Sequence, residues 1–380
     1  MLKSKTVKFS VVMFVVFLSH SFLYTQFVPY LTHVGYSSSE RGFLLAYFAI
    51  VGMLGQILTG YLSDRYGTVK KFFIFFTLIL AASGYLFYHF DAKNFWVHLV
   101  LLGFSGGLIR VLGSFFETWV LEVDGLFDKF GLIRALGSLG WALGSLLTGY
   151  LIVNYSYDVV GIVAAIFSII LVFLSLFLED ATKVETTNLK LSDIGELFSN
   201  RNYVILIVVY FITYFVYNAD SITVTELILE LGGDAQSIGV KWFIQALIEL
   251  PILFLGGRLL LKYKGRNLML FASIVMLIRF MLYGLVTEVY HVYLITLLQC
   301  ITFPLILITQ KDLVYREVPP RLRSSGQMVA VSMTIGLSAI VTPILSGYLM
   351  EIMSVKATIM VMGVTMIIPI ILMKRYQAQK

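Results

Sequence analysis

Residues 60–71, GYLSDRYGTVKK, form a short polar turn between two long apolar runs, residues 42–63 and 70–90. Each run is long enough to cross a bilayer core as a helix, which takes about 20 apolar residues. Gly67 suits a tight turn, because glycine adopts backbone conformations that other residues avoid. The stretch therefore predicts a tight connection between two membrane helices.

The whole chain has the same character as this pair of runs. Of its 380 residues, 59% are hydrophobic and only 13% are charged, and the mean hydropathy is +0.89. These values lie far from those of a soluble globular domain. No strand-like alternation of apolar and polar residues is present. We predict an all-α polytopic membrane protein with twelve spans: residues 8–33, 42–63, 70–90, 95–121, 130–153, 157–179, 201–226, 238–262, 267–287, 290–311, 324–350 and 355–375.

The longest polar interval between spans, residues 179–201, separates six spans from six. It predicts an amino-terminal six-helix bundle (1–180), a cytoplasmic linker (181–200) and a carboxyl-terminal six-helix bundle (201–380). Two six-helix halves are typical of secondary transporters whose substrate lies near the membrane midplane. Within the linker, the segment DIGELF (193–198) favours a short amphipathic helix.

Lys and Arg gather in the loops on the side of the amino terminus, which predicts that both termini are cytoplasmic in a cell-membrane protein. This bias accounts for the net charge of +6 without a nucleic-acid partner. The single cysteine, Cys300, lies within a span, so neither a disulfide nor a cysteine-based metal site is expected. No metal cluster, nucleophile constellation or phosphate loop is apparent. We therefore expect neither a cofactor, a bound metal nor a catalytic site.

The opening stretch also predicts a conformational latch made of Gly60, Asp64, Arg65 and Gly67. Asp64 can accept hydrogen bonds from the amino terminus of a neighbouring helix or pair with a basic side chain. Such a contact would form in one conformation and break in another. Gly60 is expected to let a neighbouring helix approach closely.

Ionisable side chains within spans are candidates for a functional site, because each costs at least about 2.5–3.5 kcal/mol at the bilayer centre. Residue counting places Glu117 and Arg134 at similar depth, so they can pair, and Arg110 lies two turns from Glu117 on the same helix face. It also brings Glu249, Arg279 and Gln299 near mid-membrane. A purely structural ion pair is the alternative for each cluster. Further ionisable residues near an end of span seven are Asp220 and Glu226.

Residues 131–145, GLIRALGSLGWALGS, contain Arg134 of the first of these clusters. Arg134 can donate two parallel hydrogen bonds to paired acceptors such as vicinal hydroxyls. Trp141 lies about 10.5 Å further along the helix, at 1.5 Å per residue, and offers an apolar plate for a ring. Gly137 and Ser138 leave room between them. This face predicts a binding site for a ring-bearing solute.

Two motifs resemble known transporters. The turn at 60–71 resembles the loop signature of the major facilitator superfamily, and residues 134–143, RALGSLGWAL, resemble span five of lactose permease and the oligosaccharide:proton symporters. In that family an Arg and a span-four Glu bind sugar hydroxyls and a Trp stacks on the sugar ring. The resemblance implies these roles for Arg134, Glu117 and Trp141.

The carboxyl-terminal half departs from that family pattern. Thr296, Gln299 and Thr302 stand where the permease has proton-coupling residues, and none of the three can carry a proton. A span-seven aspartate and its span-eleven lysine partner correspond to Asn218 and a position near Gly336, which leaves Asn218 as a candidate substrate contact.

Glu249 followed by Pro251, together with Arg279, is similar to the branch that includes nucleoside and phenylpropionate permease-like proteins. We predict that Glu249 couples protons to transport, since burial and a nearby guanidinium act on a carboxylate in opposite directions. Asp220 is the reserve candidate, and Gln299 belongs to the same cluster.

The sequence thus predicts a secondary active transporter. It would carry a sugar, a glycoside or another ring-bearing metabolite together with protons, by alternating access. Its partners would be a small solute, protons and the lipid bilayer, and it would function as a monomer. A proton-driven efflux antiporter, a facilitative uniporter and a solute sensor that does not transport remain alternatives.

Overall fold

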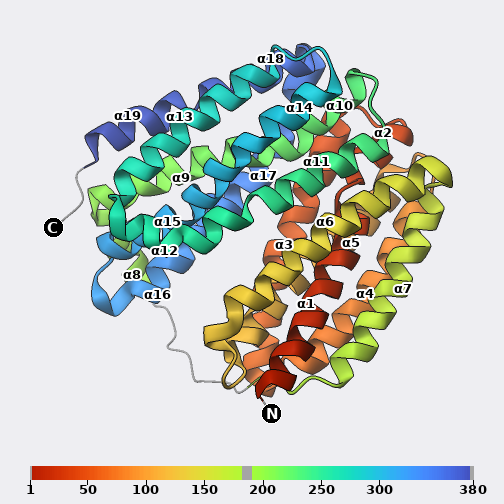
Figure 1. The fold of residues 1–380 in the computed structure, drawn as a ribbon, viewed down its shortest axis with the longest axis horizontal. Helices are drawn as coiled ribbons and strands as arrows, with labels where there is room; N and C mark the ends of the chain where they lie inside the picture. Colours follow the sequence, from red (N-terminus) through yellow and green to blue (C-terminus); the bar gives the residue numbers. More distant parts are fainter. Residues whose placement is uncertain (1, 182–190, 377–380) are drawn as a thin grey trace. The chain divides into compact units, whose positions relative to one another are not determined.

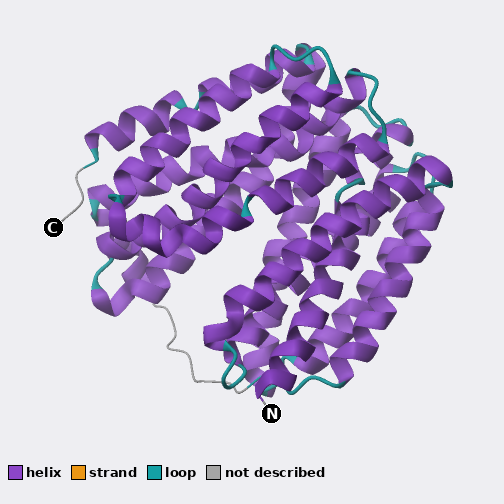
Figure 2. Ribbon diagram, in the orientation of Figure 1, coloured by secondary structure: helices purple, strands orange, loops and turns teal. Residues whose placement is uncertain are grey.

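A computed structural model describes residues 2–181 and 191–376. Within these residues the chain is helical and contains no strand (Figure 2). Twelve helices in the described part are long and apolar enough to cross a membrane. The predicted all-α membrane fold is therefore confirmed, and the predicted spans match the helices apart from their ends. The largest difference is in the tenth span, which continues to Glu317.

By their internal contacts, the described residues form two compact units. The first unit contains residues 2–181 and 232–247, and the second contains residues 191–231 and 248–376. The predicted division at 181–200 stays a prediction. Residues 182–190 of that linker lie outside the described residues, whereas helix α8 (Leu191–Ser199) confirms the short helix expected near 193–198.

Figure 1 labels the helices along the chain. The helices before residue 182 are α1 (Leu2–Tyr24), α2 (Phe27–His33), α3 (Ser38–Tyr66), α4 (Lys70–His89), α5 (Phe95–Glu122), η1 (Phe127–Lys129), α6 (Phe130–Asn154) and α7 (Tyr157–Leu176). Those after α8 are α9 (Arg201–Ala219), η2 (Asp220–Val224), α10 (Thr225–Glu230), α11 (Ala235–Ile248), α12 (Leu250–Lys262), α13 (Gly265–Tyr283), α14 (Val289–Thr296), η3 (Leu297–Ile301), α15 (Phe303–Glu317), η4 (Pro320–Leu322), α16 (Arg323–Val331), η5 (Ser332–Gly336), α17 (Leu337–Ile352), α18 (Val355–Val364) and α19 (Ile367–Arg375).

Helices α1 and α6 of the first unit pack together at very short range (Figure 1). A Cβ atom at Gly140 would lie 2.2 Å from the carbonyl oxygen of Phe14, and one at Gly144 would lie 2.0 Å from Oγ of Ser21. Only glycine permits this contact, because any side chain would overlap the backbone or side chain of α1. The close approach brings the polar residues of α6 beside the aromatic residues of α1.

The turn at 60–71 has the tight geometry that was expected at Gly67, but the close helix approach expected at Gly60 is not found within the described part of the first unit. Gly67 ends α3 with a left-handed φ of 63°. Within the described part of the first unit, no side chain or neighbouring helix lies within 4 Å of the place that a Cβ of Gly60 would take. The close contact of α3 is made earlier by Gly55, where a Cβ would lie 2.7 Å from Cγ2 of Val111 in α5.

Asp180, which follows the sixth span, holds the start of α4 in place. Its carboxylate accepts hydrogen bonds from the backbone N–H groups of Val69 and Lys70, both at 3.0 Å, and from the Thr68 hydroxyl at 2.5 Å. Lys70 in turn donates from Nζ to the carbonyl oxygens of Leu176 and Leu178. A carboxylate at a helix amino terminus satisfies unpaired N–H groups and interacts favourably with the helix dipole. The turn is thus fastened to the end of the sixth span within the first unit.

Replacing Asp180 with Ala is expected to lower the free energy of unfolding by about 1 kcal/mol at pH 7, as for other lost helix caps. Partial burial raises the pKa of this carboxyl, but the hydrogen bonds, led by that from Thr68, hold it below its usual 3.8. A lowered pKa in the folded state stabilises the protein above pH 3.8, and this contribution is lost as the pH falls through the folded-state value.

Thermal unfolding in detergent between pH 7 and pH 3 measures this effect. The gap in Tm between wild type and Asp180→Ala should be constant near neutrality and close below pH 3.8. The matched control is Glu179→Ala, whose carboxylate makes a half-exposed pair with Lys5, and it should change Tm little. A gap of equal size at every pH would contradict this role.

Several spans after residue 200 depart from regular α-helix. The seventh span contains the π-helical segment η2, and the eleventh contains the π-helical segment η5. The eighth span breaks at Glu249, just before Pro251, and the tenth contains the 3₁₀ segment η3, just before Pro304. Proline lacks the N–H group that would continue the helix, which explains the last two breaks. Such interruptions within membrane helices commonly mark functional sites.

Candidate functional site

The first candidate site lies on α6 and α5 of the first unit. Nε of Arg134 donates to Oε1 of Glu117 at 2.6 Å, and Nη1 donates to the Ser138 hydroxyl at 3.1 Å. The side chains of Arg134 and Glu117 keep 35% and 33% of their surface exposed, so the ion pair is open on one side. The pairing predicted from residue counting is present. We call Glu117, Arg134, Ser138 and Trp141 the Arg134 site.

Aromatic rings of α1 complete this site. The Phe17 ring lies 4.2 Å from Cζ of the Arg134 guanidinium and 6.4 Å from the Trp141 ring. Tyr24 lies 5.5 Å from the same indole. Phe17 also packs against Gly137, so the room expected at that glycine is filled by a ring of the protein. Neither Phe17 nor Tyr24 was predicted, and a solute at Arg134 would lie alongside both.

Arg110 faces a different set of residues from the one that was expected. Among the described residues, Glu117 pairs with Arg134 and makes no hydrogen bond or ion pair with Arg110. Instead the Arg110 guanidinium lies beside the hydroxyl of Tyr24 and 5.2 Å from the Phe48 ring of α3. Arg110 is half-buried. It therefore forms a second cationic position near the Arg134 site. Tyr24 lies beside Arg110 and also contacts Trp141 of that site.

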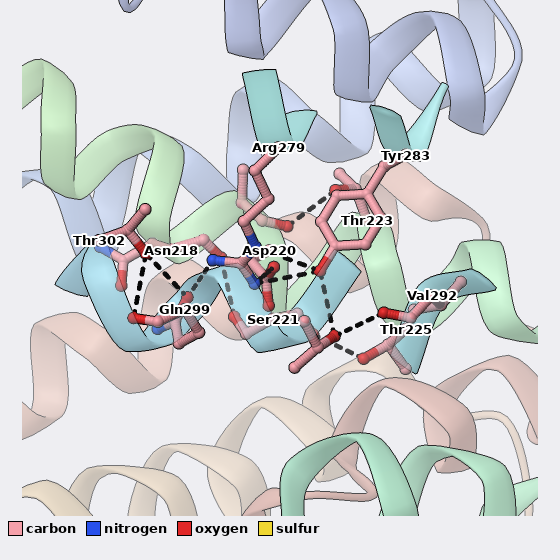
Figure 3. Close-up of polar contacts among 12 residues, drawn as sticks. Asn218, Asp220, Ser221, Thr223, Thr225, Arg279, Tyr283, Val292, Gln299 and Thr302 are labelled. Atoms are coloured by element: carbon pink, nitrogen blue, oxygen red, sulfur yellow. Dashed lines mark hydrogen bonds and ion pairs between the residues drawn. The ribbon is translucent and has the colours of Figure 1, made fainter. Parts of the chain in front are cut away.

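The second candidate site lies in the second unit and is centred on Arg279 of α13 (Figure 3). Its side chain is fully buried. Nη2 donates to Oδ2 of Asp220 at 2.5 Å, and Nη1 donates to Oε1 of Gln299. Asp220 begins the π-helical segment η2, and Gln299 belongs to the 3₁₀ segment η3. The irregular segments thus present both partners to the guanidinium.

Glu249 joins this group through Gln299. Nε2 of Gln299 donates to Oε1 of Glu249 at 2.8 Å. The sequence placed Glu249 beside Arg279, but the direct ion-pair partner in the second unit is Asp220, because the Gln299 amide stands between Arg279 and Glu249. Asp220, Arg279, Gln299 and Glu249 form one hydrogen-bonded series, which we call the Arg279 chain. Its two carboxylates lie at opposite ends.

Further polar side chains surround the Arg279 chain (Figure 3). The Tyr283 hydroxyl accepts from Nη2 of Arg279 at 3.1 Å and lies 3.2 Å from the Thr296 hydroxyl. Sequence reasoning missed Tyr283, which lies four residues after Arg279 on the same helix face. Asn218 donates to the hydroxyl of Ser338 at 3.0 Å, two residues beyond the position expected as its counterpart.

The residues of the predicted latch lie at the end of α3. Arg65 donates to the Tyr61 hydroxyl at 3.1 Å, and Asp64 is exposed. The start of α4 donates instead to the carboxylate of Asp180. The latch role of Asp64 stays a prediction. In the described part of the chain, no group of three or more His, Cys, Asp or Glu side chains could hold a metal ion.

The chain is similar to known membrane transporters over almost its whole length. The model of the MFS_1 like family matches residues 6–361. Maltose permease of Geobacillus stearothermophilus is 25% identical over 373 residues, which cover 97% of this chain and 93% of the permease. The probable 3-phenylpropionic acid transporter of Escherichia coli K12 is 22% identical over 351 residues, which cover 88% and 89%.

Solved structures share the fold. An alanine variant of the nucleoside transporter NupG superimposes with a TM-score of 0.87 at 16% identity, and the match covers 98% of this chain and 100% of that one.

Proposed function

This chain belongs to the MFS_1 like family of membrane transporters, and on that premise we propose that it carries a ring-bearing solute together with protons. Like its relatives, it is a transporter and not an enzyme. The finer proposal is supported by one observation above others. The Arg279 chain joins two carboxylates within the membrane-spanning part of one unit. A group that changes its protonation there would change its hydrogen-bond partners.

The Arg134 site is the proposed place of solute recognition. Its half-exposed ion pair offers N–H donors from Arg134 and an acceptor from Glu117, as hydroxyl groups require. Trp141, Phe17 and Tyr24 supply apolar faces for a ring. Relatives named as transporters of maltose and of 3-phenylpropionic acid agree with a ring-bearing solute.

The Arg279 chain is the proposed coupling element. Protonation of Asp220 would weaken its ion pair with Arg279. The guanidinium would then shift relative to Gln299, and the hydrogen bond from Gln299 to Glu249 would change as well. An amide can do this because it accepts with its oxygen and donates with its nitrogen. We propose the reverse sequence as well, in which Glu249 takes the proton first. Both routes link proton binding to helices that contain irregular segments.

The remaining features of the proposal follow from the sequence. The protein would lie in the cell membrane with both termini in the cytoplasm, in keeping with the positions of its basic residues. It would act as a monomer with two six-helix halves and would work by alternating access. Asp64 and Arg65 would form and break contacts as the conformation changes, and Asn218 is a proposed solute contact of the second unit.

Replacing Glu249 with Gln is the test of coupling. We expect this variant to lose uphill solute accumulation while it retains solute exchange across the membrane, because Gln preserves the hydrogen bond to Gln299 but cannot bind and release a proton. Purified protein in vesicles with an imposed pH gradient measures both activities. The matched control is Glu196→Gln, an exposed carboxylate on α8. Uphill uptake that persists in Glu249→Gln would remove Glu249 from the mechanism.

A further inference from the structure

Arg110 is a cation within a membrane span, and among the described residues no carboxylate pairs with it. Its side chain is half-buried. Its neighbours are the neutral hydroxyl of Tyr24 and the ring of Phe48, at 5.2 Å from Cζ. The aliphatic part of the Arg110 side chain packs against Gly52 of α3. Cδ of Arg110 lies 3.1 Å from the position that a Cβ atom at Gly52 would take. The charge is therefore held at one place.

The other two arginines of the candidate sites each have an acidic partner. Arg134 pairs with Glu117, and Arg279 pairs with Asp220. A charged group within a membrane is costly unless it is paired, so an arginine without a counter-charge calls for an anion from elsewhere. The half-exposed position of Arg110, next to the rings of the Arg134 site, makes a bound solute the nearest source of that anion.

We propose that Arg110 is the counter-charge of the solute, and that the solute is a ring-bearing monocarboxylate. This inference rests on the proposed function and adds the charge of the solute. The carboxylate would meet the Arg110 guanidinium and the Tyr24 hydroxyl. The ring would lie toward Trp141, whose indole is 5.5 Å from the Tyr24 ring, and polar ring substituents would reach Arg134 and Glu117.

A single negative charge fits this site better than a phosphate does. A phosphate group carries up to two negative charges, whereas Arg110 supplies one positive charge. Arg134 already faces Glu117, and two of its nitrogens are engaged, Nε by Glu117 and Nη1 by Ser138. A carboxylate also matches the planar fork of a guanidinium, which can bind both of its oxygens at once.

Matched pairs of carboxylates and amides test this inference. Wild-type protein in detergent is titrated with benzoate, phenylpropionate, hydroxyphenylacetate and indoleacetate, each beside its neutral amide, while tryptophan fluorescence reports binding. Maltose and uridine serve as neutral ring solutes. We expect at least one carboxylate to bind at least tenfold more tightly than its amide. Arg110→Gln should bring that ratio close to one, and Arg110→Lys should keep an intermediate ratio.

The control is Arg201→Gln, an exposed arginine at the start of α9, which should leave the ratio unchanged. Size-exclusion profiles show whether each variant remains folded. An intermediate ratio of carboxylate to amide affinity in Arg110→Lys shows that the lost charge, and not a lost fold, causes the effect of Arg110→Gln. The inference is overturned if no carboxylate binds, or if maltose or uridine binds and Arg110→Gln leaves that affinity intact. Failure of the proposed function looks different: carboxylate binding would still depend on Arg110, but vesicles would show no proton-driven accumulation.

Discussion

Replacing Arg134 with Lys is expected to weaken solute binding at least about 30-fold, although the positive charge remains. Losing a bidentate, charge-assisted contact to the solute is expected to cost about 2 kcal/mol, and 1.4 kcal/mol is a factor of ten. Lysine cannot keep the geometry of Arg134, whose guanidinium binds Glu117 and Ser138 at the same time and stacks on Phe17. It has no planar fork to offer a solute.

Equilibrium binding of a transported solute to purified protein measures this loss. The same substitution at an exposed arginine, Arg201→Lys, is the control and should bind as wild type does. An Arg134→Lys protein with an affinity within about threefold of wild type would show that recognition at this site depends on charge alone, and would contradict the proposed fork.

Replacing Asp220 with Asn is expected to lower the free energy of unfolding by about 3–5 kcal/mol, because it leaves the guanidinium of Arg279 buried without its charge partner. Arg279 is fully buried and Asp220 is only 2% exposed. The double variant Asp220→Asn, Arg279→Gln removes both charges, so it should be more stable than the single Asp220 variant. Coupling should be lost in both.

Thermal and denaturant unfolding in detergent provides the measurement, arranged as a double-mutant cycle with Arg279→Gln alone as the fourth protein. The control is Asp312→Asn, which removes an i,i+4 pair with the largely exposed Arg316 and should cost less than 1 kcal/mol. Equal stability of Asp220→Asn and wild type would show that the buried pair contributes nothing to the fold.

Residue counting along the sequence was sufficient for the Glu117–Arg134 pair. The two residues lie near facing ends of consecutive spans that are joined by a short turn, so their separation along the chain fixes their relative depth. The twelve spans were predictable for a similar reason, because an apolar run of sufficient length has few alternatives to a membrane helix. Both predictions depend on distance along the chain and on hydrophobicity alone.

The partner of Arg279 was not predictable in this way. Asp220, Glu249 and Gln299 come from three different spans, and which of them meets the guanidinium depends on how each helix is rotated. The π-helical segment that begins at Asp220 changes this rotation, and no sequence signal marked it. Sequence analysis therefore identified the members of the Arg279 chain but paired Arg279 with the wrong carboxylate.

Three other differences between expectation and structure have different causes. Phe17 and Tyr24 were missed because the chain contains 30 Phe and 22 Tyr, so an aromatic residue within a span carries little information. Gly60 was interpreted as a close helix contact from its motif position, whereas the described residues of the first unit leave open space there. Asp180 was overlooked because it lies in a polar stretch after its span, where an acidic residue is unremarkable.

The central claim is that solute and protons move together in the same direction, and the change in external pH on solute addition tests it most directly. Cells or vesicles that contain the wild-type protein, in weakly buffered medium, should make that medium more alkaline when a transported solute is added. The Glu249→Gln variant should exchange solute without this change. Solute entry with no change in pH would indicate a uniporter, acidification would indicate an antiporter, and either result would contradict proton symport.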